Sequence, residues 1–189
     1  MKILTPDFYN RDTQIVAQEL LGTIMVSVID GIFVSGMIIE TEAYKGVDDP
    51  ASHAYRGKTV RNAALFGPVG RGYVYFIYGN HFCFNVVARA SDTVAGGVLI
   101  RALKPIEGIA QMHTRRGGTV SMKNLLNGPG KLTQALGITR VHNGLDITNN
   151  NQLYIVQAPL DLPVITPIAS ARIGIRVGQD LLWRFYSPF

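Results

Sequence analysis

Two carboxylates and an aromatic ring alternate along residues 37–44, a segment rich in β-branched side chains. Because side chains alternate between the two faces of a strand, Glu40, Glu42 and Tyr44 should share one face. A carboxylate held beside a ring that stacks a planar substrate is a candidate general base. Burial or the neighbouring negative charge would raise its pKa. A solvated strand face, or a cap that ties down the following loop, explains the same residues equally well.

A second aromatic group lies in the segment YVYFIYGNH, where Tyr73, Tyr75 and Tyr78 stand close together. Tyr suits half-buried strands, and this accounts well for Tyr73. It accounts poorly for Tyr78, which enters a predicted Gly79-Asn80 turn where a large ring has little core to pack against. A ring on a protruding hairpin tip can act as a wedge between stacked nucleic-acid bases.

Four positively charged residues are interleaved with rings between residues 53 and 75: Arg56, Lys58, Arg61 and Arg71. This pattern suits a phosphate-binding surface with stacking platforms, although a solvated loop would carry the same charges. Arg101 differs, because it stands in the apolar segment VLIRAL and an unpaired buried charge is very costly. One interpretation is a structural salt bridge to Glu42 or Glu40. The other is a functional arginine that binds a phosphate or helps to hold a catalytic carboxylate and its water, and both can hold together.

The composition excludes several classes of protein. Lys and Arg number 18 against 13 Asp and Glu, and the net charge of +5 favours a polyanionic partner. The single cysteine, Cys83, excludes a disulfide framework, and the four histidines lack metal-ligand spacing. Lys131 follows Gly128-Pro129-Gly130 without completing a Walker motif, yet near a helix start it could meet a phosphate. The chain has no apolar run of membrane length and no secretory signal, which predicts a cytosolic protein.

Turn and cap residues predict the elements that position these side chains. Asp30-Gly31 and Gly79-Asn80 each separate two strand-like runs and predict antiparallel hairpins. Asp12 is a candidate helix N-cap. Helices are predicted over residues 13–21, 105–115 and 129–136, and strands over residues 23–29, 32–44, 73–78, 81–88, 98–103, 153–157, 171–177 and 182–186. Without a βαβ rhythm, this predicts an α+β fold around a curved, mostly antiparallel sheet, with 45–72 as a long loop of the kind that is often functional.

A series of motifs resembles the alkyladenine (3-methyladenine) DNA glycosylase family, in the family's order and spacing. They are ETEAY (40–44), ASHAYRG (51–57), RN (61–62), YVYFIYGNHFCFN (73–85), VLIRAL (98–103), P-x-EG (105–108) and GPGKLTQALGI (128–138). The resemblance runs from about residue 3 to residue 186 and leaves no room for another domain. It implies one compact catalytic domain over residues 1–189, with a β-hairpin at 73–87 that protrudes and intercalates into DNA. At its tip, Asn80 and His81 stand where the family often carries bulkier apolar or aromatic side chains.

The resemblance implies a monofunctional glycosylase of base excision repair. Such an enzyme flips a damaged purine out of duplex DNA and hydrolyses its N-glycosidic bond, leaving an abasic site. Glu42 would be the catalytic general base that activates water, and Arg101 would help to hold that water. The substrate-binding residues would be Tyr44, His53, Tyr75 and Asn85, the first three sandwiching the base and the last disfavouring guanine. The DNA-binding residues would be Tyr78 as the wedge, with Arg61, Arg116 and Lys131 near phosphates.

The expected substrates are 3-methyladenine and 7-methylguanine, with hypoxanthine and ethenoadenine as further candidates. A cationic alkylated purine stacks well on Tyr rings and leaves easily, so neither a metal nor a cofactor is expected. The expected partner is double-stranded DNA containing damaged purines, with no membrane and no obligate protein partner. The chain would act on the nucleoid in a bacterial cytoplasm, or in a eukaryotic nucleus. A non-catalytic damage-binding module and a hydrolase of small nucleosides are the alternatives; Glu42 argues against the first, and Tyr78 and the positive charge against the second.

Overall fold

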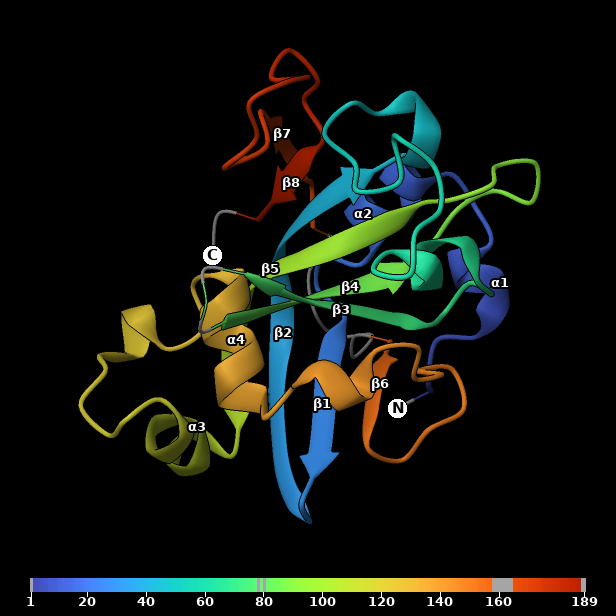
Figure 1. The fold of residues 1–189 in the computed structure, drawn as a ribbon. Coiled ribbons are helices and arrows are strands. Elements are labelled where there is room, and N and C mark those ends of the chain that lie inside the picture. The colour runs from blue at the N-terminus through green and yellow to red at the C-terminus, as the bar shows by residue number, and fades with distance from the viewer. Residues whose placement is uncertain (1, 78, 80, 158–164, 188–189) are drawn as a thin grey trace.

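The described part of the chain is built on one antiparallel sheet. The computed structural model describes residues 2–77, 79, 81–157 and 165–187 of the 189. Over these residues, eight strands run in the order β3-β4-β5-β2-β1-β6, with β8 beside β2 and β7 beside β8 (Figure 1). The strands are β1 (Ile24–Ile29), β2 (Ile32–Tyr44), β3 (Gly72–Ile77), β4 (His81–Val87), β5 (Gly97–Glu107), β6 (Leu153–Val156), β7 (Ile168–Ser170) and β8 (Arg184–Tyr186).

Four α-helices pack around this sheet in the described ranges. They are α1 (Pro6–Tyr9), α2 (Thr13–Glu19), α3 (Ile109–Arg115) and α4 (Pro129–Leu136). The Asp12 side chain caps α2 by accepting a hydrogen bond from the amide of Gln14, as predicted. Within those ranges, none of the helices has the length and apolarity needed to cross a membrane. Helices on a curled antiparallel sheet confirm the α+β class (Figure 1).

Both predicted hairpins pair as expected. Asp30 and Gly31 have φ values of 56° and 72°, the positive pair that a tight two-residue turn requires, and they connect β1 to β2. The second hairpin pairs β3 with β4 from Gly72 opposite Val86 to Ile77 opposite His81. Tyr78 and Asn80, in the connection between these strands, lie outside the described residues.

The main apolar core joins the sheet to α2 and α4. Phe84 and Ile100 from the strands are fully buried in one cluster with Leu20, at the end of α2, and Leu132, within α4. On β2, the Thr41 hydroxyl donates a hydrogen bond of 2.7 Å to the carbonyl of Ala17 in α2. Since neighbouring side chains on a strand point to opposite faces, this contact directs Glu42 away from α2.

The expectation of a helix beginning at Pro105 is wrong. Strand β5 continues through Pro105, which faces Gly36 of β2 next to an irregularity in the register, where a proline is tolerated. Gly108, with a φ of 71°, ends the strand and begins α3. Pro105 has no backbone N–H to donate, and it therefore lies at a bulge of the sheet and not at the start of a helix.

The expectation of a strand over residues 171–177 is also wrong, because this segment has no regular secondary structure. Its alternating pattern is inverted in the fold: Arg172 is buried, while Ile173 and Val177 are about half exposed. An ion pair holds the arginine inside, and the segment becomes part of a cavity wall. The last predicted strand is present but shorter, as Arg184–Tyr186.

Candidate active site

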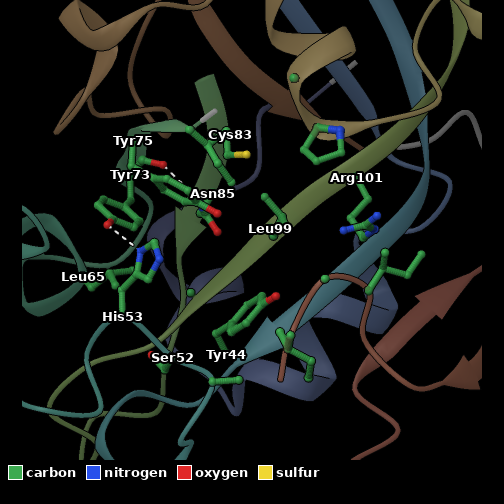
Figure 2. A pocket seen from close by; sticks show the side chains of 18 of the residues that line it. Tyr44, Ser52, His53, Leu65, Tyr73, Tyr75, Cys83, Asn85, Leu99 and Arg101 are labelled. Atoms are coloured by element: carbon green, nitrogen blue, oxygen red, sulfur yellow. Dashed lines mark hydrogen bonds between the residues drawn. The ribbon is translucent and has the colours of Figure 1, made fainter. Parts of the chain in front are cut away.

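A cavity of about 610 Å³ lies between strands β3, β4 and β5, the end of β2, the 50–65 part of the long loop, the start of α4 and the 173–177 segment. This size falls within the range of about 300–1,000 Å³ that is common for small-molecule sites. Figure 2 shows Tyr73, Tyr75 and His53 on one side of the cavity and Tyr44 and Arg101 on the other. The long loop that the sequence marked as functional thus supplies part of the wall.

Three rings from two segments form an aromatic wall. The ring centroids of His53 and Tyr75 lie 4.6 Å apart at an interplanar angle of 71°, and those of Tyr73 and Tyr75 lie 5.3 Å apart. The Tyr73 hydroxyl lies 2.9 Å from Nδ1 of His53. Burial raises the pKa of Tyr73 to about 12, and burial followed by the charge of Arg61 lowers the pKa of His53. Both rings are therefore neutral at pH 7, which suits stacking of a planar group.

The carboxylate of Glu42 is fully buried behind this cavity and does not line it. Its Oε1 accepts a hydrogen bond of 2.7 Å from the amide of Ile173, and its Oε2 accepts one of 2.8 Å from the hydroxyl of Tyr44. Nη1 of Arg101 lies 3.3 Å from the same Oε2. Tyr44, Arg101 and Ile173 do line the cavity, so each of these three contacts joins Glu42 to a residue of the cavity wall.

Burial raises the pKa of Glu42, while the charge of Arg101 and the hydrogen bonds from Ile173 and Tyr44 act in the opposite direction. Arg101 also donates from Nε to Oε1 of Glu40 at 2.9 Å, and Arg184 contacts the same oxygen at 2.7 Å. The salt bridge, one of the two interpretations of Arg101, is present, and it involves both Glu40 and Glu42. The site thus contains a carboxylate whose ionised form is supported by one guanidinium and two other donors.

Two more predicted residues lie on the cavity wall near the aromatic rings. Asn85 of β4 is buried, and its Nδ2 donates a hydrogen bond of 3.2 Å to the carbonyl of Tyr73 (Figure 2). The guanidinium carbon of Arg61 lies 6.0 Å from the centroid of the Tyr75 ring, at the distance of a weak cation–π contact. The structure therefore brings Asn85 and Arg61 to the same cavity as His53 and Tyr75.

Lys131 also lines the cavity, at the start of α4, with its ammonium 2.8 Å from Oδ1 of Asn127. Arg116 does not line it: this residue caps the end of α3 and donates to the side chain of Gln134 in α4. Tyr78 lies outside the described residues.

Sequence reasoning missed two positions that hold the site together. The first is the backbone amide of Ile173, which contacts Glu42; an amide leaves no trace in side-chain pattern. The second is Asn62, whose buried Nδ2 donates to the carbonyls of His53 and Gly57 at 2.7 and 3.0 Å. Asn62 belongs to the RN motif (61–62) of the resemblance. Its place after Arg61 in a glycine-rich loop was the only sign in the sequence that its side chain holds the loop backbone.

The described residues contain no group of three or more His, Cys, Asp or Glu side chains that could hold a metal ion. Cys83 is buried and points toward the cavity beside Tyr75 (Figure 2), and burial raises the pKa of its thiol. A thiol with a raised pKa is a poor nucleophile at neutral pH.

The sequence of this chain is similar to those of known proteins. Residues 7–188 match the model of a family described as methylpurine-DNA glycosylase (MPG). A protein of Carboxydothermus hydrogenoformans named "Putative 3-methyladenine DNA glycosylase" is 50% identical over 186 residues, covering 97% of this chain and 94% of the relative. Proteins with the same name from Clostridium acetobutylicum and Chlorobaculum tepidum are 45% and 46% identical, covering 98% and 100% of this chain and 94% and 90% of the relatives.

Proposed function

This chain belongs to the methylpurine-DNA glycosylase family, and we propose that it excises alkylated purines from duplex DNA and leaves an abasic site. The chemistry is hydrolysis of the N-glycosidic bond, as in a DNA-3-methyladenine glycosylase. The observation that carries the proposal is the hydrogen bond from Tyr44, on the wall of an aromatic cavity, to the buried carboxylate of Glu42.

The cavity suits a purine that has been turned out of the helix. Extrusion costs a few kcal/mol and costs least for a damaged pair. In this proposal the base stacks between Tyr44 on one side and the rings of His53 and Tyr75 on the other. Methylation at N3 or N7 makes the purine cationic, and a cation is attracted to the faces of electron-rich rings.

Glu42 is the proposed base that takes a proton from the attacking water. An ionised carboxylate offers about four acceptor positions, of which the amide of Ile173 occupies one on Oε1. The attacking water would have to enter from the cavity past Arg101 and take another of these positions. The negative charge also stabilises the positive charge that develops on the sugar as the bond breaks. A cationic purine departs as a neutral base and needs no general acid.

Two further roles concern selection of the base and contact with DNA. Asn85 would crowd the position of the guanine 2-amino group. 7-Methylguanine carries the same group but departs far more easily because it is cationic, so the crowding makes normal guanine in particular a poor substrate. Tyr78 would fill the gap that the extruded base leaves in the stack. Arg61, Lys131 and Arg116 would lie near phosphates, a contribution that weakens as salt rises.

The test uses the purified chain in the presence of EDTA. Duplexes that carry one 7-methylguanine or one hypoxanthine, together with an undamaged duplex, are incubated and treated with alkali to reveal abasic sites. We expect strand cleavage with the 7-methylguanine duplex and none with the undamaged control; cleavage with hypoxanthine would widen the substrate range to deaminated purines. Tight binding without base release would indicate a damage-binding module instead. Release from free nucleosides at a rate independent of salt would indicate a nucleoside hydrolase.

A further inference from the structure

A buried ion pair lies directly behind the proposed base pocket. Both Arg172 and Asp49 have fully buried side chains, although they stand in two segments without strand or helix character. Nη2 of Arg172 donates to Oδ1 of Asp49 at 2.8 Å, and Nη1 donates to Oδ2 of the same carboxylate. Nη1 also donates to the carbonyl of Ala43 at 3.0 Å. This two-pronged geometry is the strong and directional form of an arginine–carboxylate contact.

The guanidinium of Arg172 also lies close to two aromatic rings. Its central carbon is 4.7 Å from the ring centroid of Tyr44 and 5.1 Å from that of Trp183. Tyr44 lines the cavity and Arg172 does not, so the guanidinium contacts a ring of the cavity wall without lining the cavity itself. A base stacked on the exposed face of Tyr44 would therefore lie one ring away from Arg172.

The same arginine determines where the next residue lies. The amide of Ile173 donates to Oε1 of Glu42 at 2.7 Å, and Arg172 immediately precedes it. Arg172 thus lies against the ring that donates to Oε2, and its anchored side chain belongs to the residue just before the amide that donates to Oε1. Because a carboxylate is held only as well as its donors are held, movement of Arg172 would disturb two of the three contacts of Glu42, those from Tyr44 and from the Ile173 amide.

We propose that the Arg172–Asp49 pair is a positioning device that aligns Tyr44 and the Ile173 amide on Glu42, and that its neutrality lets the pocket accept a cationic purine. This inference rests on the proposed glycosylase function. Arg172 acts through Tyr44 and Ile173, so it is a positioning residue and not a catalytic one. Asp49 cancels the charge of Arg172 at the point where a positive base would otherwise meet it across one ring.

The charge effect distinguishes this role from a merely structural one. Asp49→Asn retains hydrogen bonding to Arg172 and leaves its positive charge uncompensated. A cationic 7-methylguanine would be repelled, while hypoxanthine, which gathers negative charge as its bond breaks, would not. Like charges within about 8 Å of one another in a partly desolvated site repel strongly enough to change a rate about tenfold. A general loss of folding would slow both substrates alike.

The experiment measures single-turnover base release and duplex affinity with 7-methylguanine and hypoxanthine duplexes. For Asp49→Asn we expect the ratio of the 7-methylguanine rate to the hypoxanthine rate to fall about tenfold. Where the wild type binds hypoxanthine without cutting it, the ratio of affinities replaces the ratio of rates. The matched control is Asp146→Asn, the same change in the partly exposed Arg71–Asp146 pair. A ratio equal to that of the wild type would overturn the proposal.

Arg172→Lys tests positioning separately from charge. Lysine keeps the positive charge but loses the two-pronged contact and the flat stack on Tyr44. We expect release from both duplexes to fall about tenfold, with the rate ratio and the duplex affinity kept. Wild-type rates in this variant would contradict the positioning role.

A folding control covers the case in which Asp49→Asn does not fold, since breaking a buried pair is strongly destabilising. The double variant Arg172→Gln with Asp49→Asn contains no buried charge at this place. We expect it to keep the wild-type substrate ratio and to release both bases more slowly; wild-type rates would overturn the proposal. If the wild type releases neither base, the proposed function itself fails, and this outcome is distinct from the others.

Discussion

The hydroxyl of Tyr44 donates a hydrogen bond of 2.8 Å to Oε2 of Glu42 and so joins a ring on the cavity wall to a carboxylate buried behind it. Burial and the charge of Glu42 both raise the pKa of Tyr44, so the hydroxyl keeps its proton and remains a donor at neutral pH. A base that stacks on this ring is therefore one side chain away from the proposed general base. The geometry and the charges of this pair lead to the following predictions.

Arg101→Gln should shift the pH dependence of base release. In the proposed mechanism release needs ionised Glu42, so the rate should fall as the pH drops through the raised pKa of this residue. The charge of Arg101 lowers that pKa, and its removal would raise the pKa further. We expect the acidic limb of the single-turnover rate profile to move to higher pH and the rate at pH 7 to fall about tenfold.

The same linkage predicts the effect on stability. A carboxyl whose pKa is higher in the folded state stabilises the fold at acidic pH and loses this contribution as the pH rises through the folded pKa. Arg101→Gln should therefore lower the free energy of unfolding more at pH 8 than at pH 4. Arg71→Gln, a change in a partly exposed ion pair, is the control. An unchanged acidic limb in Arg101→Gln would argue against ionised Glu42 as the base.

Arg61→Ala should raise the pKa of His53. Burial lowers this pKa first, and the charge of Arg61 lowers it further, so the variant removes the second cause only. An NMR titration of the His53 ring measures the change, and Arg56→Ala, at another exposed position of the same loop, is the control. A titration curve identical to that of the wild type would show that Arg61 does not act on this ring in solution.

Asn85→Ser should weaken discrimination against normal guanine. The shorter side chain would open space where the guanine 2-amino group is expected, and one such contact decides about 1–3 kcal/mol of selectivity. The measurement is release of guanine from undamaged duplexes, with Asn149→Ser at an exposed position as the control. A guanine rate that stays at the wild-type level would place the discrimination elsewhere in the pocket.

Gly46→Ala should destabilise the loop that carries Asp49 and His53. Gly46 has a φ of 73°, and a Cβ there would lie 2.1 Å from the carbonyl oxygen of Ala95. We expect the free energy of unfolding in urea to fall by about 3 kcal/mol. Gly57→Ala, with a φ of 90° and no atom within 4 Å of the added Cβ, should lose only about 1 kcal/mol. Equal losses in the two variants would show that the close approach to Ala95 is unimportant.

Local patterns in the sequence predicted the elements whose signals lie within a few residues. The Asp30-Gly31 turn was enough to predict the β1–β2 hairpin, and the period of two along β2 was enough to predict that Glu42 and Tyr44 share a face, where the two side chains form a hydrogen bond. These predictions succeeded because turn geometry and strand alternation depend on the nearest neighbours only.

Tertiary contacts decided the parts that were mispredicted. The 171–177 segment has a strand-like alternation of polar and apolar residues. Its arginine, Arg172, is nevertheless buried because it pairs with Asp49, far away in the sequence, while the apolar Ile173 and Val177 are half exposed. By its sequence alone Pro105 resembles a helix start. In the fold it pairs with Gly36 of β2 and forms part of a bulge. The contact between the Ile173 amide and Glu42 joins positions more than a hundred residues apart, and no local pattern encodes it.

The most direct test compares Glu42→Gln with Glu40→Gln on a duplex that carries a single 7-methylguanine. Both changes remove one negative charge next to Arg101, but only Glu42 contacts Tyr44 and the Ile173 amide. We predict that Glu42→Gln lowers the single-turnover rate by about a hundredfold or more while it still binds the duplex, and that Glu40→Gln keeps most of the rate. Release by Glu42→Gln at the wild-type rate would contradict the assignment of Glu42 as the general base.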